Sequence, residues 1–173
     1  MKLSSKGRYA VMAMVDLASS TRQNPRAKPV PLADIASRQE ISLSYLEQLF
    51  GKLRRGGLVR SVRGPGGGYL LARGAEQIRV ADVILAVDEP IKATRCRDGS
   101  PKGCLKQQGR CLTHDLWEEL GHQIRLFLSS VSLEDVCARQ VQAKFWLYSL
   151  ERRPEGMPES GPAEAPAMST AAQ

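Results

Sequence analysis

The sequence predicts a mainly α-helical fold with a small β-hairpin wing, that is, a winged helix-turn-helix followed by a long dimerisation helix. Three observations predict it. Two helical patterns with helix-turn-helix spacing occupy residues 32–55, a glycine-rich hairpin follows at 58–71, and a long helix with regularly spaced apolar residues lies downstream. We therefore expect a DNA-binding region at 1–73, a ligand loop with dimerisation helices at 74–150, and a disordered tail at 151–173.

The first helix is expected around Tyr9 to Ala18, which is apolar on nearly every side and is broken only by Asp16. Such a helix suits the centre of a domain. A polar loop with two prolines follows it. Pro31 can then begin a short second helix, because the N–H that proline lacks is not needed in the first turn.

The second and third helices have the spacing of a helix-turn-helix. Small and apolar residues fall where two such helices pack together, at Ile35, Ala36, Ile41, Leu46 and Leu49. Glu40 stands in the turn, where a glycine is common. Ser42 can cap the third helix, because its hydroxyl can accept a hydrogen bond from a free backbone N–H. Gly56 and Gly57 can end that helix.

The third helix is amphipathic, and its polar side is the candidate for reading DNA. Its expected apolar face comprises Leu43, Leu46, Leu49, Phe50 and Leu53. The other side and its flanks carry groups suited to base edges and phosphates in a major groove, at Ser44, Tyr45, Glu47, Gln48, Lys52 and Arg55. An ordinary solvated helix face has a similar composition, so the helix alone does not decide its function.

A β-wing is expected directly after this helix. Residues 58–63 alternate as a short strand, 64–68 form a tight turn, and 69–71 return as the second strand. Arg63 at the tip can enter a minor groove, where negative potential attracts guanidinium groups. The glycines do not indicate a nucleotide site, because no Lys-Ser/Thr pair or helix start follows them.

Positive charge is concentrated in the same region of the chain. Residues 1–73 hold 13 Lys and Arg against 4 Asp and Glu, a net charge of +9. Residues 74–173 hold 12 against 14, a net charge of −2. A basic half that also carries a reading helix and a wing favours double-stranded DNA as its partner.

Glu47 is the exception on the reading helix, because DNA phosphates repel a carboxylate. The residues three and four positions away are Leu43, Ser44, Phe50 and Gly51, so no local ion pair explains it. A carboxylate can accept a hydrogen bond from a cytosine amino group. Glu47 is therefore a candidate for selecting among operators, and a tolerated surface charge is the alternative.

A short helix is expected at 80–87 and a long one from Leu112 to Val131. Apolar residues recur on the long helix at intervals of four and three, which makes a narrow seam like that between two helices, at Trp117, Leu120, Ile124, Phe127 and Val131. We expect a homodimer across this seam, since helix-turn-helix proteins usually place two reading helices on a pseudo-palindromic operator. Packing inside one chain is the alternative.

The segment before the long helix carries four potential metal ligands in a basic loop, at Cys96, Cys104, Cys111 and His114. Thiolates suit zinc, copper(I) or the iron of an iron–sulfur cluster, and imidazole suits zinc or iron. Spacing alone supports an iron–sulfur cluster and a structural Cys₃His zinc site equally. A thiol-redox enzyme is disfavoured, because the chain has no Cys-x-x-Cys pair.

The location expected from the sequence is the cytoplasm. No apolar run of 18 residues is present, and the N-terminus lacks the apolar core of a signal peptide, so we expect no membrane span. Cysteines there are normally reduced, which favours a metal or redox role over a disulfide. Cys137, apart from the loop, is expected to be a buried small hydrophobe.

Three stretches carry a resemblance to a known family: Ser4 to Ala10 (SSKGRYA), Ile41 to Phe50 (ISLSYLEQLF) and Val62 to Leu71 (VRGPGGGYLL). Together with the Cys/Cys/Cys-x2-His set, residues 1–135 strongly resemble the IscR family of iron–sulfur cluster assembly regulators. The resemblance implies a homodimeric repressor or activator rather than an enzyme. It also implies one [2Fe-2S] cluster per subunit, supplied by cluster donor proteins and held by Cys96, Cys104, Cys111 and His114.

The same resemblance implies that cluster occupancy changes the class of operator that is bound. It implies that DNA is read by Ser44, Tyr45, Glu47, Gln48 and Arg63, with the glutamate matching Glu47 disfavouring one operator class. The chain departs from the family in its ligand loop, where the gaps between cysteines are one or two residues longer. Insertions in loops cost little free energy.

Overall fold

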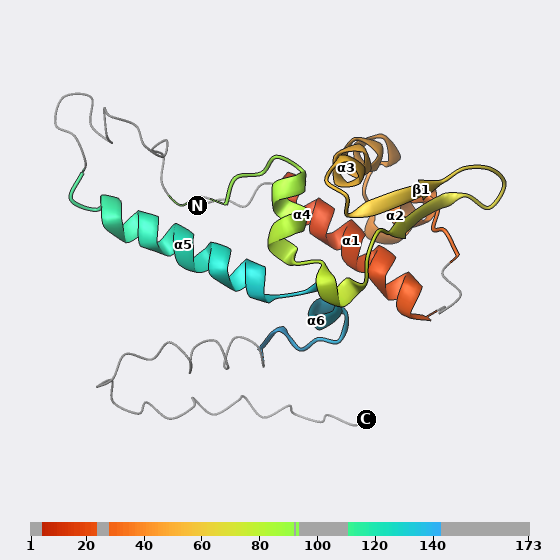
Figure 1. The fold of residues 1–173 in the computed structure, drawn as a ribbon. Helices are drawn as coiled ribbons and strands as arrows, with labels where there is room; N and C mark the ends of the chain where they lie inside the picture. Colours follow the sequence, from red (N-terminus) through yellow and green to blue (C-terminus); the bar gives the residue numbers. More distant parts are fainter. Residues whose placement is uncertain (1–4, 24–27, 92, 94–110, 143–173) are drawn as a thin grey trace, which may run out of the picture.

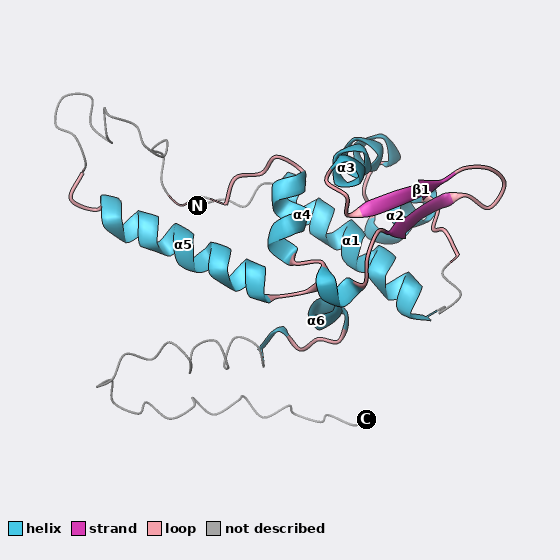
Figure 2. Cartoon of the chain, in the orientation of Figure 1, coloured by secondary structure: helices cyan, strands magenta, loops and turns pink. Residues whose placement is uncertain are grey.

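The computed structural model of the chain describes residues 5–23, 28–91, 93 and 111–142 (Figure 1). Within these ranges helices dominate and the sheet is one antiparallel hairpin (Figure 2), so the predicted fold class is confirmed. In chain order the elements are α1 (Ser5–Gln23), α2 (Leu32–Gln39), α3 (Leu43–Arg55), β1 (Val59–Val62), β2 (Gly68–Leu71), the 3-10 turn η1 (Ala75–Gln77), α4 (Val80–Ala86), α5 (His114–Ser130) and α6 (Leu133–Cys137).

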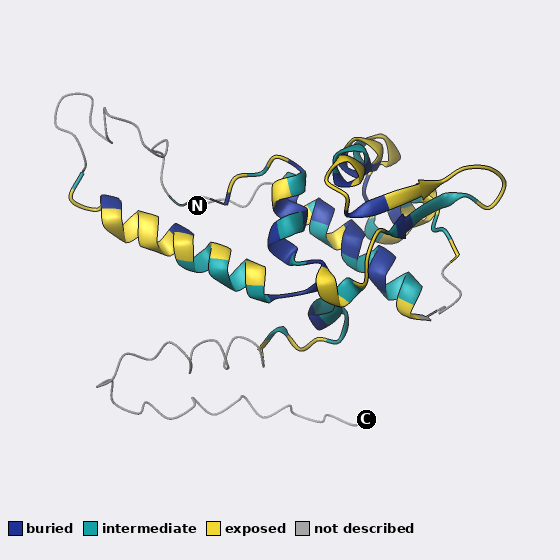
Figure 3. Ribbon diagram, in the orientation of Figure 1, coloured by how far each residue is buried: buried dark blue, intermediate teal, exposed yellow. Residues whose placement is uncertain are grey.

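Helix α1 runs through the middle of the N-terminal part of the chain, as its apolar composition predicts. Ala10, Ala13, Met14 and Leu17 are fully buried. The helix contacts α2, α3, α4, α6 and β2, so it holds the helix-turn-helix and the later helices to one core (Figure 1). The buried side of α1 is visible in Figure 3 as dark segments facing its neighbours.

The contacts of Asp16 with α2 explain why a charged residue lies on this apolar helix. Its carboxylate is almost completely buried and lies 2.6 Å from Arg38 Nη2 of α2. Gln39 Nε2 donates a further hydrogen bond to it at 2.7 Å. The hydrogen bond to Asp16 also raises the pKa of Arg38. The one polar residue in the apolar run therefore anchors α2 to α1, and neither partner could be identified from helical spacing, since both lie more than 20 residues away.

The turn between α2 and α3 has the geometry that a glycine usually supplies. Glu40 adopts φ 53° and ψ 40°, in the left-handed region. The N–H of Ile41 donates to the carbonyl of Ala36 at 3.1 Å, which closes the turn. Glu40 thus adopts a conformation that favours glycine, at the modest cost that a non-glycine residue carries there.

Helix α3 begins and ends where the sequence predicts. Ser42 Oγ accepts a hydrogen bond from the N–H of Tyr45 at 3.4 Å, and Gly57 follows the helix with φ 69°. Of the five residues predicted for its apolar face, Leu46, Leu49, Phe50 and Leu53 are buried. The prediction for Leu43 is wrong. It lies in the first turn, beyond the part of α3 that packs on the core, and is exposed.

The wing pairs Val59 with Leu71 and Val62 with Gly68. The predicted alternation is not observed in β1, where only Val59 is buried. The hairpin projects beyond the core, so both faces of its outer part meet solvent (Figure 3). Gly68 is required at the start of β2, next to the turn of the wing, because a Cβ there would lie 2.4 Å from the carbonyl carbon of Val30.

Helix α4 connects the N-terminal part of the chain to α5 through a second apolar cluster. Val80, Ala81, Ile84, Ile91 and Val131 are buried in it, with Ile124, Phe127 and Leu128 of α5 packed against them. The rest of α5 extends away from the body of the molecule (Figure 1). None of the helices in the described ranges is long and apolar enough to cross a membrane.

Candidate functional site

The predicted reading residues of α3 are available to a partner. Ser44, Glu47, Gln48 and Arg55 are exposed. Tyr45 is half-buried, because its ring packs edge-on against Tyr9 at a centroid distance of 6.1 Å. The exposed side of α3 therefore carries one hydroxyl, one amide, one guanidinium and one carboxylate, and a fixed phenol stands at its margin. The part that these residues play in binding DNA stays a prediction.

The wing is held in place relative to this helix. Arg54 Nη1 donates to Ser61 Oγ of β1 at 3.4 Å. The rings of Phe50 and Tyr69 meet edge-to-face with centroids 4.9 Å apart. Arg63, in the exposed turn beyond β1, is thereby carried at a defined distance from α3. A rigid pairing of helix and wing is what simultaneous contact with two adjacent grooves requires.

Glu47 is exposed, and no ion pair or hydrogen bond of its carboxylate occurs within the ranges that the structure describes. We expect Glu47→Ala to broaden operator choice, because it removes a carboxylate that repels phosphate and accepts hydrogen bonds only from base amino groups such as that of cytosine. The ratio of affinities for preferred and disfavoured operators should fall about tenfold at fixed salt. An unchanged ratio would show that Glu47 does not contribute to the choice of operator.

Lys52, near the end of α3, forms an ion pair with the residue at which the ligand loop begins. Its Nζ lies 2.7 Å from Asp88 Oδ2. The hydrogen bond from Lys52 holds the pKa of Asp88 below its usual value, and the same bond raises the pKa of Lys52. Lys6 Nζ of α1 donates to the Asp88 carbonyl at 3.4 Å. Three elements therefore meet at Asp88.

Asp88 has a strained backbone, with φ 56°. Ile91, three residues later, is buried in the apolar cluster of α4 and α5. The start of the ligand loop is thus tied to α3 by Lys52 and to the core by Ile91. Sequence reasoning missed this ion pair, because its partners are 36 residues apart and share no helical repeat.

Of the four predicted metal ligands, the structure describes Cys111 and His114, whereas Cys96 and Cys104 lie outside the described residues. Cys111 is a free, partly exposed thiol. Its carbonyl accepts the N–H of His114 at 3.0 Å, which sets the two ligands one turn apart at the start of α5. The imidazole of His114 is 8% exposed. A free thiol and an adjacent imidazole are a donor set that fits iron–sulfur or zinc ligation.

Cys137 differs from Cys111 in both position and chemistry. It is partly buried in α6, and its Sγ lies 3.7 Å from the carbonyl oxygen of Val15. Burial, with a smaller contribution from Glu134, raises the pKa of the Cys137 thiol. A thiol whose pKa is raised stays protonated and is a poor metal ligand.

The predicted seam on α5 divides into two parts. Val131 is only 2% exposed, and Ile124 and Phe127 pack partly against α4 within the same chain. Trp117 and Leu120, nearer the start of the helix, are 44% and 38% exposed. The outer half of the seam is therefore free to meet another chain, whereas its inner half already belongs to the core.

Two further residues belong to the exposed apolar face of α5. Leu112, just before the helix, is fully exposed, and Leu116 is 62% exposed. They continue the series 112, 116, 120, 124, whose period of four is helical. That spacing could have identified both residues from the sequence. They were missed because the alternating spacing of three and four residues was followed only from Trp117 onward.

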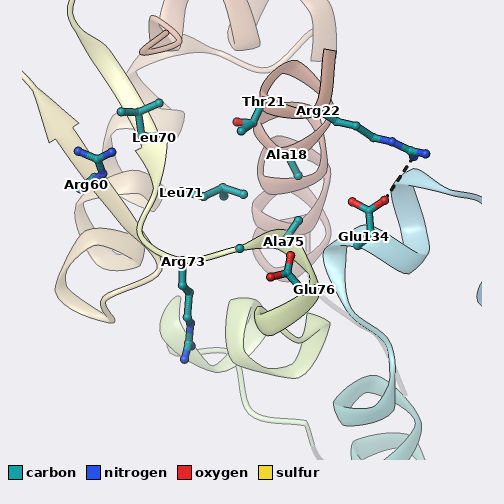
Figure 4. A pocket seen from close by; sticks show the side chains of 11 residues that line it. Ala18, Thr21, Arg22, Arg60, Leu70, Leu71, Arg73, Ala75, Glu76 and Glu134 are labelled. Carbon is teal, nitrogen blue, oxygen red and sulfur yellow. Dashed lines mark ion pairs between the residues drawn. The ribbon is translucent and has the colours of Figure 1, made fainter. Parts of the chain in front are cut away.

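A pocket of about 310 Å³ lies between the end of α1, the base of the wing and α6 (Figure 4). Its apolar floor includes Ala18, Leu70 and Ala75, and at its edge Arg22 Nη1 pairs with Glu134 Oε1 at 3.5 Å. None of the residues predicted to bind DNA, metal or a second chain lines it.

The chain is similar to known transcriptional regulators. A family model described as "Rrf2: Iron-dependent Transcriptional regulator" matches residues 3–139. The "HTH-type transcriptional regulator IscR" of Photorhabdus laumondii is 59% identical over 141 residues, which are 81% of each chain. The protein of the same name from Escherichia coli O1:K1 is 54% identical over 140 residues, 81% of this chain and 82% of that one.

Solved structures agree with these sequence relatives. T. potens IscR superimposes with a TM-score of 0.63 at 36% identity and covers 86% of this chain and 96% of its own. CymR, described as the global cysteine regulator of B. subtilis, gives a TM-score of 0.65 at 31% identity over 80% of this chain and 98% of its own.

Proposed function

This chain belongs to the Rrf2 family of iron-dependent transcriptional regulators, and from that premise we propose that it is a regulator of iron–sulfur cluster assembly genes whose operator choice depends on a bound iron–sulfur cluster. The observation that carries the proposal is the position of Cys111 and His114 at the start of α5, directly after a basic loop with two more cysteines. The family makes the chain a DNA-binding regulator and not an enzyme.

The cluster would be held by Cys96, Cys104, Cys111 and His114, and we propose one [2Fe-2S] cluster in each subunit, delivered by cluster donor proteins. When bound, the cluster supplies an iron centre that responds to oxidants and to iron supply. His114 is nine-tenths buried at the base of α5, so its ring orientation is restricted before any ligand binds. The basic residues of the loop offset the negative charge of thiolate ligands.

Two copies of the chain would bind one pseudo-palindromic operator. The exposed apolar face of α5, formed by Leu112, Leu116, Trp117 and Leu120, supports a two-fold interface there. A patch of this kind on a helix that extends from the body is typical of a protein contact rather than of solvent exposure. Two reading helices related by a two-fold axis would then face two half-sites of DNA.

Helix α4 offers a route by which the ligand loop can influence the reading helix. It contacts α1, α3 and α5. A Cβ on Gly56, at the end of α3, would lie 3.0 Å from Ala86 Cβ, so the two helices are in close contact at this point. The Lys52–Asp88 ion pair joins the same two segments. Ligands that shift the loop can therefore bias α3 through their differential affinity for two arrangements of α4.

We expect Asp88→Asn to reduce, about two- to fivefold, the ratio by which cluster loading changes operator preference, because an exposed ion pair carries a modest share of such a coupling. Cluster absorption and non-specific DNA binding should stay unchanged. Since the pKa of Asp88 is depressed in the folded chain, the ion pair is present above the ordinary pKa of the carboxyl and is lost as pH falls through the lowered value. Operator titrations of loaded and cluster-free protein measure the effect.

The matched control for this variant is Glu134→Gln. It breaks the exposed Arg22–Glu134 pair, which joins α1 to α6 and does not involve α3 or the ligand loop. Its operator ratios should equal those of the unmodified chain. Equal reductions in both variants would contradict a specific route through Asp88.

Metal analysis tests the proposed cofactor most simply. Protein purified without oxygen should be coloured and contain iron and acid-labile sulfide in equal amounts, two of each per chain for a [2Fe-2S] cluster. The competing possibility is a winged-helix factor with a structural Cys₃His zinc site. A colourless protein with one zinc ion per chain and no sulfide would contradict the proposed cluster and support the structural zinc site.

A further inference from the structure

The first turn of α5 brings together a second set of potential metal ligands that does not include a cysteine. One ligand atom from each of His114, Asp115 and Glu118 lies within 4.8 Å of the other two. His114 Nε2 and Glu118 Oε2 are 3.5 Å apart. The imidazole is nearly buried, whereas both carboxylates are exposed. Burial restricts the orientation of the imidazole ring, and the carboxylate side of the group faces solvent.

Helical geometry explains why these three residues converge. His114 and Glu118 are four residues apart and Asp115 and Glu118 are three apart, and both intervals place side chains on adjacent positions of a helix surface. The helix dipole puts about half a positive elementary charge at this end of α5. That partial charge opposes a cation, but two carboxylates outweigh it. Acidic residues stabilise the start of a helix, and this effect alone would explain Asp115 and Glu118. It does not explain the histidine beside them.

The chemistry of the set differs from that of the cysteine loop. An imidazole nitrogen with two carboxylate oxygens suits divalent ions such as Mn²⁺ and Fe²⁺, whereas thiolates select softer metals. Cys111 is not a member of this group, and its Sγ contacts Thr113 Oγ1 at 3.6 Å instead. His114 is common to both sets, and a neutral imidazole offers only one unprotonated nitrogen, so the ring can bind one of the two at a time.

We propose that the chain without its cluster binds one divalent cation of the Mn²⁺ or Fe²⁺ class through His114, Asp115 and Glu118, and that this ion competes with the cluster for His114. The competition rests on the proposed function, whereas the binding of the cation does not. A rise in free divalent metal would then slow cluster loading. The regulator would then respond to the concentration of free divalent metal as well as to the cluster, and both would act through His114.

Manganese is the probe that separates this site from the thiolates. The full-length, cluster-free, reduced chain is titrated with Mn²⁺, and free Mn²⁺ is followed by its electron paramagnetic resonance signal. One ion should bind per chain. Glu118→Gln and Asp115→Asn should each weaken binding at least tenfold. Glu119→Gln is the matched control, since Glu119 is exposed on the same turn but outside the group, and it should bind as the unmodified chain does.

Binding in Glu118→Gln equal to that of the unmodified chain would overturn the proposal, as would the absence of saturable binding at millimolar Mn²⁺. Cys111→Ala should lose the cluster and keep the Mn²⁺ site. The competition is tested by loading the cluster with and without Mn²⁺, which should slow loading in the unmodified chain but not in Glu118→Gln. Equal loading rates would overturn the competition. A chain that binds Mn²⁺ but never accepts a cluster would contradict the proposed function and leave the cation site standing.

Discussion

Replacing Leu120 by glutamate is expected to convert the proposed dimer to a monomer and to lower operator affinity at least a hundredfold. Leu120 is 38% exposed in one chain, so the substitution should leave the fold of the subunit intact. In the proposed interface it would bury a charge among apolar side chains. A central interface residue contributes about 2 kcal/mol, hence about 4 kcal/mol in a two-fold dimer that contains it twice. That corresponds to a dissociation constant about a thousandfold larger.

Sedimentation equilibrium measures the oligomeric state and operator titration measures the affinity. His122→Glu is the matched control, because His122 is exposed on the same helix at a position on the side opposite Leu120. The control should remain a dimer with unchanged operator affinity. If Leu120→Glu stays dimeric at the same concentrations as His122→Glu, the interface lies elsewhere on the molecule.

Cys111→Ala is the second substitution expected to have a large effect. It removes one of four proposed ligands, and the visible absorption of the cluster should disappear, because even the loss of an outer partner of a metal ligand weakens affinity about 10- to 100-fold. Operator preference should become that of the cluster-free protein under all conditions. The fold should be unaffected, since the Cys111 side chain packs against neither of the two apolar cores of the described chain.

Cys137→Ala controls for the loss of a thiol as such. Cys137 is a partly buried residue packed against the main core, and its raised pKa keeps it protonated. This variant should keep the absorption and the operator switch. Loss of the cluster in both variants, or in neither, would contradict the assignment of Cys111 as a ligand.

The elements that sequence analysis predicted best are those whose determinants are local. The boundaries of α2 and α3 follow from Pro31, Ser42 and Gly57, each of which acts within one helical turn. In the sequence Glu40 stands where a glycine is common, and the structure shows that this residue adopts the left-handed conformation. Local rules could not show that Leu43 is exposed, because its burial depends on how far α3 extends past the core.

Contacts between residues far apart in the sequence could not be predicted from the periodicity of the helices. Asp16 appeared only as an interruption in an apolar helix, and its pairing with Arg38 depends on how α2 crosses α1. Lys52 and Asp88 are similar, since neither lies in a motif. On α5 the spacing predicted a seam, but whether each residue of it is exposed, as near Leu120, or buried, as at Val131, depends on where α4 packs.

The most direct test of cluster gating compares one preparation of the protein before and after its cluster is removed, without oxygen and at fixed salt. Affinities for two operators of different class are measured in both states, so that the phosphate contribution common to both cancels. The proposed function predicts that the ratio of the two affinities changes about tenfold or more when the cluster is removed. An unchanged ratio, with the cluster demonstrably present in one sample and absent from the other, would contradict it.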